Sequence, residues 1–370
     1  MANQNIRTPR FYIDEISYLL SRGVAQNGQF DVVATGGSGA TATRGIQTGS
    51  EAELFDMRPL NKVDFDTSGD PDSQVLITID TQSSTSKKSY VAILNHNLFS
   101  AVGKIRIFAG NVSSDVASVD GTAADTADID WSAVTTAEVV NADAIAETGI
   151  SDAAYDDRSV VIEPAANGTT IVTFPETNLR YWGIQFEGKT SDTSATHHDG
   201  TWGSTDLFVG GIMLGEYFEL RPPDLAVQRS IAFDNVNIQE SVGGQRYSNM
   251  SSHGRQATTT TRSPFVTGSY QQNIYGGRLS FDMNFSYLAS TDVMPNEYGA
   301  IQDTDDAVVQ DIWNKTNGPH LPFIFSVDKD SAGANAESEM IFARFGQNNI
   351  DMSQVALDTW NISMRIEEEF

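Results

Sequence analysis

Five histidines are the side chains best suited to metal or proton chemistry, because the sequence contains no cysteine. None stands in the H-E-x-x-H spacing of zinc proteases, and none accompanies a G-x-S-x-G nucleophile elbow. His197, His198 and Asp199 are adjacent and allow a metal site, but their Thr-, Ser- and Gly-rich surroundings favour a solvated loop. For His96, between Asn95 and Asn97 after a run of strand formers, we expect a turn cap. The five are His96, His197, His198, His253 and His320.

Other sequence patterns of catalytic or ligand-binding sites are incomplete. Gly36-Gly-Ser-Gly39 lacks the G-K-[ST] ending of a phosphate-binding loop, which favours a flexible linker. The acidic run Asp125–Asp130 can supply oxygen ligands to calcium, but it lacks the glycine and final glutamate of an EF-hand. The absence of cysteine excludes disulfides and thiolate nucleophiles. We therefore expect a non-enzymatic protein without a cofactor or a bound metal.

The charge balance restricts the possible partners. The chain carries 23 basic and 49 acidic residues, a formal net charge of −26. A general nucleic-acid-binding protein needs a basic surface to neutralise phosphates, so we expect no nucleic-acid partner. The first ten residues lack the apolar core of a signal peptide, and no run approaches the roughly 20 apolar residues of a membrane span. We therefore expect no membrane partner either.

Two groups of residues remain as candidate contacts to a partner. Residues 245–263 contain Arg246, Arg255 and Arg262 but no acidic residue, so this stretch can meet an acidic partner. The alternative interpretation is an ordinary mobile hairpin tip. Trp131 and Trp202 lie in predicted loops and are the candidate aromatic contacts of a carbohydrate-binding module. Their alternative interpretation is that they anchor the loops on a sandwich core.

The elements that must position these residues are predicted to be strands in two domains, after an N-terminal arm of residues 1–30. Within this arm, Ile13, Ile16, Leu19 and Leu20 fit a short helical stripe ended by Gly23, or Phe11 to Ile13 form a strand that leads into a short helix. Residues 31–220 contain short runs of strand formers joined by polar loops, which indicates a β-sandwich or jelly roll.

An acidic segment interrupts this first domain. Residues 112–163 carry 12 acidic residues and a single Arg158, so we expect a long acidic surface insertion. A helical patch around Ala133–Ala146 is the other possibility. The first domain ends at Arg221-Pro-Pro-Asp224, because two prolines cannot continue a central strand.

Residues 225–370 are predicted to form a β-sandwich or split barrel that carries one helix. Residues 276–288 alternate as one long strand that places Leu279, Phe281, Met283, Phe285 and Tyr287 on a single face. Asp303 or Thr304 is expected to cap a helix over residues 305–315, with Val308, Ile312 and Trp313 buried, which Asn317-Gly318-Pro319 then ends. Strands are expected over residues 322–327, 339–345 and 359–370.

Three strands resemble the discoidin-like sandwich domains of tailed-bacteriophage virion proteins. Tyr90-Val-Ala-Ile-Leu-Asn-His-Asn-Leu98 is similar to their v-a-i-l-x-H-N-L strand. Arg180-Tyr-Trp-Gly-Ile-Gln185 is similar to their r-Y-W-r-l strand, and Phe208-Val-Gly-Gly-Ile-Met-Leu-Gly-Glu216 to their i-G-r-l-f-L-G-e strand. The resemblance covers about residues 50–220, but no binding residue carries over because the matching motifs are core strands.

The second domain resembles the tail-tube-like split barrel of phage distal-tail and baseplate-hub proteins. It shares their long alternating strand, their Trp-bearing helix, a Pro-Phe strand and a closing W-x-[IV]-x-[ML]-x-[IL]-x-E-E strand at residues 360–369. The resemblance implies an oligomeric structural protein of the virion, assembled in the host cytoplasm, in the tail or baseplate, with itself and other virion proteins as partners. The alternative is a virion module that binds a host carbohydrate or receptor; capsid decoration and glycan degradation are further possibilities.

Overall fold

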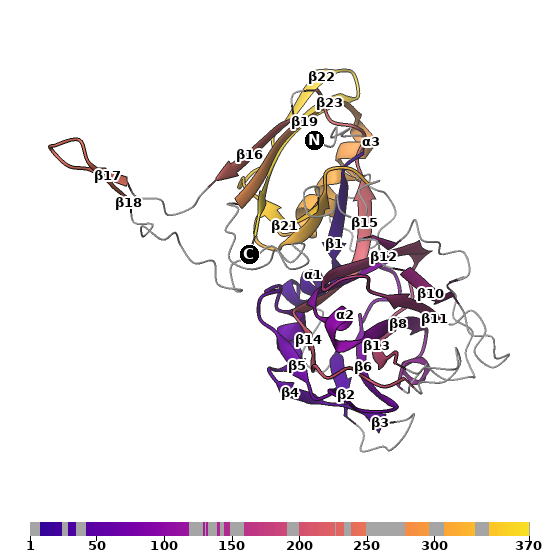
Figure 1. Ribbon diagram of the computed structural model, residues 1–370. Helices are drawn as coiled ribbons and strands as arrows, with labels where there is room; N and C mark the ends of the chain where they lie inside the picture. The colour runs from indigo at the N-terminus through magenta and orange to yellow at the C-terminus, as the bar shows by residue number, and fades with distance from the viewer. Residues whose placement is uncertain are drawn as a thin grey trace.

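The computed structural model describes residues 8–23, 29–34, 42–117, 129, 131, 139–140, 144–148, 159–190, 200–225, 227–232, 238–248, 278–295, 307–329 and 340–369. These residues fold mainly into antiparallel β-sheets with a few short helices (Figure 1). The all-β expectation is therefore confirmed.

The first half of the chain is built from two sheets that pack face to face. One is part of the largest sheet and contains β9 (Val139–Val140), β12 (Gly168–Thr177), β7 (Lys88–His96) and β15 (Gly211–Glu219). The other contains β2 (Phe30–Val33), β3 (Ala42–Thr43), β6 (Ser73–Asp80), β8 (Gly103–Gly110), β10 (Ala144–Thr148), β11 (Ser159–Glu163) and β13 (Tyr181–Gly188).

Alternate residues of both sheets meet in a common core, as a sandwich requires. Val91, Ile93 and Ile212 contribute from the first sheet, and Ile77, Ile107 and Ile184 from the second. A small third sheet closes one side: β4 (Ile46–Thr48), β5 (Val63–Phe65) and β14 (Leu207–Val209). Short helical turns complete the half: η2 (Glu51–Phe55), α2 (Leu98–Ala101) and η3 (Ser113–Asp115).

The described part of the acidic insertion adds strands to both sheets. Val139–Val140 pair with β12, and Ala144–Thr148 pair with β11. The alternative of a helical patch around Ala133–Ala146 is therefore wrong at these positions, because the neighbouring strand edges offer backbone partners to an extended chain. Most of the remaining insertion lies outside the described residues.

The second half continues the largest sheet and covers one face of it with short helices. Its strands are β16 (Gln228–Ala232), β19 (Arg278–Ala289), β20 (Phe323–Ser326), β21 (Met340–Phe345), β22 (Met352–Ala356) and β23 (Thr359–Glu368). Its helices are α3 (Ser290–Val293) and the π-helix η6 (Val308–Asn314).

Strand β19 follows its predicted alternation until a bulge. Phe281, Met283 and Phe285 are buried, but Tyr287 is 71% exposed. The pairing with β23 shifts between Phe285 and Leu288, and Tyr287 has a positive φ of 60°. This bulge moves the inward position by one residue, so Leu288 takes the place in the core that was expected for Tyr287.

The predicted helix over residues 305–315 is present but shorter. It runs from Val308 to Asn314 with π-type hydrogen bonding, and the expected caps lie outside the described residues. The Ala307 backbone N–H donates to Asp311 Oδ2 at 2.6 Å, so a carboxylate from the first turn satisfies the helix entrance. Val308 and Ile312 are buried as expected, whereas Trp313 is half-buried. The helix ends before Asn317 and Gly318, both with positive φ.

The N-terminal segment joins the two halves. Strand β1 (Arg10–Asp14) lies between β15 and β20, antiparallel to both, and α1 (Glu15–Ser21) follows it. Of the two alternatives, the strand that leads into a short helix is confirmed. Phe11 and Ile13 enter the core of the second half, while Tyr12 packs with residues of both halves on the opposite face. Thus the described part of the arm packs on its own chain. Through β1, strands of the two halves form one continuous 11-stranded sheet.

Candidate functional site

His96 is a structural residue at the end of β7. Its Nδ1 accepts a hydrogen bond from the Leu98 backbone N–H at 3.3 Å, at the start of α2, so the turn-cap interpretation is confirmed. Its Nε2 lies 2.9 Å from the Thr170 hydroxyl. Burial lowers the pKa of His96 to about 3, because the charged imidazolium would lose its hydration. The ring is therefore neutral at ordinary pH.

The other sequence candidates for metal or phosphate chemistry fall largely outside the described residues. This applies to His197, His198 and Asp199, to Gly36–Gly39, and to Asp125–Asp130 except Ile129. Within the described ranges, no group of three or more His, Cys, Asp or Glu side chains is arranged to hold a metal ion. No helix among the described residues is both long and apolar enough to cross a membrane.

The two candidate tryptophans are core residues and not exposed contacts. Trp131 and Trp202 are 0% and 2% exposed. The Trp131 ring lies 5.3 Å from that of Phe174, and Trp202 Nε1 donates to the Ser73 carbonyl at 2.9 Å. The interpretation of both rings as anchors of their loops on the sandwich core is therefore confirmed, and their alternative role as exposed aromatic contacts is wrong, because these rings bury a large apolar area.

Arg246 lies on a hairpin that stands away from the body of the molecule (Figure 1). The hairpin consists of β17 (Ile238–Glu240) and β18 (Arg246–Ser248), joined through a turn in which Gly244 has a φ of +81°. The Arg246 Nε lies 3.4 Å from Glu240 Oε2, so the charge of this arginine is balanced within the hairpin. Arg255 and Arg262 lie outside the described residues.

The same hairpin exposes apolar side chains. Ile238 and Tyr247 are 59% and 56% exposed, and Val242 is fully exposed. An isolated two-stranded hairpin is marginally stable in water. These side chains therefore make the hairpin a candidate contact surface.

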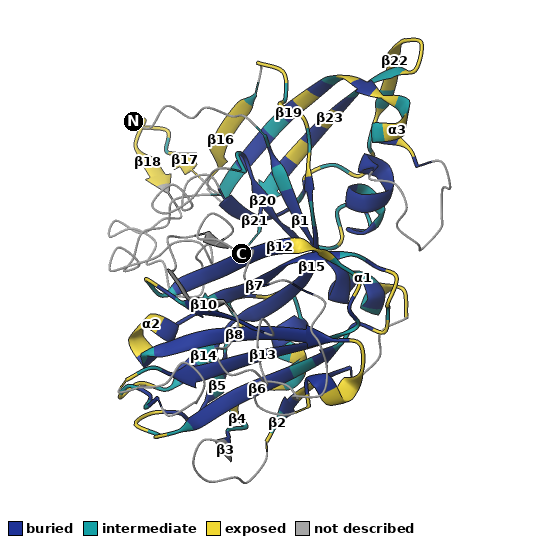
Figure 2. Cartoon of the chain, turned by 90° about the vertical axis from the view of Figure 1, so that its right-hand side faces the viewer, coloured by how far each residue is buried: buried dark blue, intermediate teal, exposed yellow. Residues whose placement is uncertain are grey.

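Two edge strands of the second half form the strongest candidate site. Strand β23 pairs with β19 on one side, and with β21 and β22 on the other; β19 then pairs with β16. Within the described part of the chain, β16 and β22 each pair on one side only, so their free edges face opposite directions of one sheet. All residues of β16 and four of the five in β22 are exposed, as the yellow ribbons of Figure 2 show.

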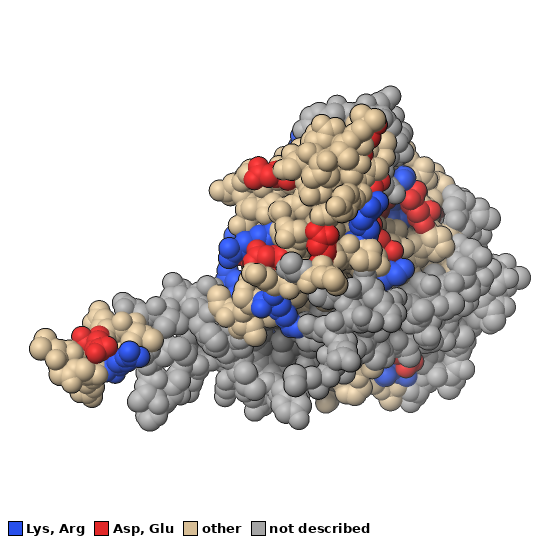
Figure 3. All heavy atoms as spheres, turned by 90° about the horizontal axis from the view of Figure 1, so that it is seen from above, with Lys and Arg blue, Asp and Glu red and all other residues tan. Residues whose placement is uncertain are grey.

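These edges carry few of the features that usually prevent strands from pairing with other chains, namely Arg229 on β16 and a register shift between Gln354 and Ala356 in β22. Exposed edges are commonly protected by charged residues, proline or bulges. Strand β16 reads Gln-Arg-Ser-Ile-Ala and β22 reads Met-Ser-Gln-Val-Ala, with one charged residue between them and no acid, although the chain has 49 acids. Ile231 and Val355 are 57% and 47% exposed. Seen from above, the described surface of this half is mostly uncharged, with charges in small mixed groups (Figure 3).

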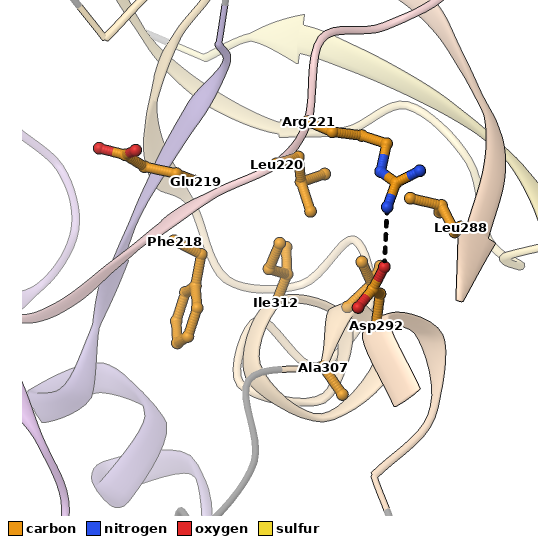
Figure 4. Close-up of a pocket in the computed structure, with 9 residues that line it drawn as sticks. Phe218, Glu219, Leu220, Arg221, Leu288, Asp292, Ala307 and Ile312 are labelled. Atoms are coloured by element: carbon orange, nitrogen blue, oxygen red, sulfur yellow. Dashed lines mark hydrogen bonds and ion pairs between the residues drawn. The ribbon is translucent and has the colours of Figure 1, made fainter. Parts of the chain in front are cut away.

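A pocket of about 290 Å³ lies between the end of β15, α3 and η6 (Figure 4). Phe218, Leu220 and Ile312 line it, and Arg221 and Asp292 lie at its side with Nη2 and Oδ2 3.2 Å apart. Small-molecule sites usually enclose roughly 300–1,000 Å³. The pocket is at the lower end of that range, and Arg221 and Asp292 bind each other, so it is a weaker candidate than the edge strands.

No family model, curated protein or solved structure matches this chain. The candidate site therefore depends on its geometry. Sequence reasoning did not identify β16 and β22 as edge strands, although an acid-free, proline-free strand in an acidic chain is a signal that can be found in the sequence.

Proposed function

We propose that this chain is a non-enzymatic structural component of a tailed-phage virion, placed in the tail or baseplate and acting through self-association. The exposed, acid-free and proline-free edges of β16 and β22 are the observation that carries the self-association. The motifs of residues 90–98, 180–185 and 208–216, which resemble discoidin-like virion domains, support the place in a virion. The proposal describes the first half as discoidin-like and the second as tail-tube-like.

In the proposed assembly, β16 of one copy adds to β22 of the next. In the part of the chain that the structure describes, each edge offers unpaired backbone N–H and C=O groups, and pairing satisfies them while it buries Ile231 and Val355. Because the two edges differ and face opposite directions, the contact joins different surfaces of the two copies and is heterologous. Repeated contacts of this kind give a closed ring if the rotation from one copy to the next divides a full turn evenly. The hairpin of β17 and β18 adds a second contact to a neighbouring copy through Ile238, Val242 and Tyr247.

The test is the oligomeric state of the full chain over a range of concentrations, measured by light scattering after size exclusion and by electron microscopy. We expect a closed ring whose mass is a multiple of 40.2 kDa. Lysine at an edge strand opposes pairing, so Ile231→Lys and Val355→Lys should each give monomers. Because both side chains are exposed, the variants should keep the thermal stability of the monomer.

Phe99→Lys is the matched control. Phe99 is 52% exposed on α2, a helix of the first half, so its replacement introduces the same charge away from both edges and should leave the ring intact. A chain that remains monomeric at high concentration would contradict self-association. A ring that persists in both edge variants would contradict the pairing of β16 with β22.

A further inference from the structure

The sheet of the second half has two faces of different character. Met283 on β19 and Met364 on β23 lie opposite each other and belong to the buried core, so we call this side the core face. The next opposed pair, Asn284 and Ser363, points to the other side, where the Ser363 hydroxyl donates to Asn284 Oδ1 at 2.6 Å. We call this second side the polar face.

Strand β16 continues both faces to its edge. Opposed residues of an antiparallel pair point to the same face. Arg229 lies opposite the core residue Phe281, with its guanidinium carbon 5.6 Å from the ring centre, so Arg229 and Ile231 belong to the core face. Ser230 lies opposite Ser280 on the polar face, and their hydroxyl oxygens are 2.6 Å apart.

Strand β22 continues the same two faces to the other edge. Met352 lies opposite the buried Ile362, so Met352 and Gln354 belong to the core face. Ser353 lies opposite Asn361 on the polar face. Each edge therefore places apolar or long side chains on the core face and a serine on the polar face.

The core of the second half ends at both edges in apolar side chains that are only half-buried. They pack against the core on one side, and their remaining surface is exposed at the margin of the sheet. Since both groups lie on the core face, the two edges present matching apolar margins. These side chains are Val227 and Leu279 at the β16 edge, and Ile350, Met352 and Trp360 at the β22 edge.

We propose that neighbouring copies join with the core faces of their sheets on the same side, so that the apolar layer of the second half continues from one copy to the next. This inference rests on the proposed self-association through β16 and β22. Strand β16 runs in the direction of β23, whereas β22 runs in the direction of β19. With the core faces on one side, β16 of one copy is therefore antiparallel to β22 of the next.

The side chains also select a register for this antiparallel pair. When Ser230 opposes Ser353 of the next copy, Ile231 opposes Met352. Apolar side chains then meet on the core face, and Ser353 extends the hydroxyl pair of Ser230 and Ser280 on the polar face. Opposed residues of these types are favourable cross-strand pairs.

Other registers lose one of these matches. A shift by one residue opposes Ile231 to Ser353, two side chains that belong to different faces. A shift by two residues moves the pairing into the irregularity between Gln354 and Ala356, or beyond Met352 at the beginning of β22.

Disulfide crosslinking tests the shared face, because the chain has no cysteine of its own. The two edges lie at opposite sides of the sheet, so a disulfide between β16 and β22 can form only between copies. Opposed Cβ atoms are roughly 4.5–5.5 Å apart, close to the separation that a disulfide requires. The double variants Ile231→Cys/Met352→Cys and Ser230→Cys/Ser353→Cys should each give, after oxidation, a ladder of covalent multimers on a non-reducing gel.

The matched control is Ile231→Cys/Ser353→Cys, which places the two thiols on different faces and should crosslink at least about tenfold less. Ile231→Cys alone should give no crosslinked dimer, because β16 does not meet a second β16. All of these substitutions except Met352→Cys replace exposed side chains, so the variants should fold.

The outcomes separate this inference from the proposed function. Crosslinks in the mixed-face control in place of the two same-face variants would mean that successive sheets are turned over, which overturns the shared face and leaves the pairing of β16 with β22. Dimers of Ile231→Cys alone would show a two-fold contact and overturn the register. An oligomer that crosslinks in none of the double variants overturns both the inference and the pairing of the two edges.

Discussion

Replacement of His96 by glutamine should remove a specific weakness of the fold toward acid. The neutral ring accepts from the Leu98 N–H through Nδ1, so Nε2 carries the proton toward Thr170. Protonation would place an N–H against the N–H of Leu98 inside the core. The folded chain therefore resists protonation of His96 until about pH 3, whereas the unfolded chain takes up a proton near pH 6.5.

The size of the effect follows from these two values. A lowered pKa contributes stability that is complete above pH 6.5 and is lost as the pH falls through about 3. At pH 5.0 the loss is about 2 kcal/mol, and below pH 3 it reaches about 5 kcal/mol, at 1.36 kcal/mol per pH unit. Glutamine carries both an acceptor and a donor but does not titrate, so the variant should not show this loss.

The assay is urea unfolding followed by tryptophan fluorescence at pH 7.5 and 5.0. The difference in unfolding free energy between His96→Gln and wild type should shift by about 2 kcal/mol in favour of the variant on going to pH 5.0. His320→Gln is the control, because His320 is exposed. For this variant, the difference in unfolding free energy from wild type should be nearly the same at the two pH values. Equal differences at the two pH values would refute the reasoning that the buried ring is held neutral.

Two further substitutions test the packing of the first half. Trp202→Ala should lower the unfolding free energy by about 3–5 kcal/mol, because it removes a buried ring and the donor to the Ser73 carbonyl; a loss below about 1 kcal/mol by urea unfolding would contradict the anchoring role. Gly183→Ala should cost about 1–3 kcal/mol, because the new Cβ would lie 2.3 Å from the Phe108 ring. Gly243→Ala, where only Ser241 Oγ lies near at 3.9 Å, should melt within about 2 °C of wild type and is the control in calorimetry.

Several elements were predictable because their cause is local. Alternation of apolar side chains predicted β19 and β23, and a run of strand formers predicted β7. Asn317 and Gly318 ended the helix as expected, since both residues tolerate positive φ. Period, turn chemistry and capping act within a few residues of the chain, so the sequence expresses them directly.

Other features depend on which distant segments meet. The bulge that exposes Tyr287 and buries Leu288 comes from the register between β19 and β23. Trp131 and Trp202 look like loop residues in the sequence, and only the sandwich gives them a core to enter. Local periodicity contains no information on these partners.

The sequence by itself determined the all-β class, the acidic charge and the positions of most strands. The charge follows directly from the composition, and the strands follow from the spacing of apolar residues along the chain. Only the tertiary structure decided that β1 lies between β15 and β20. That placement brings Asp14 and Glu15 to the same joint as Lys315, from positions about 300 residues apart in the chain. Among the described residues, it also left β16 and β22 paired on one side only. Strand order is set by packing and by the pairing of backbone groups over the whole sheet, and no local pattern encodes it.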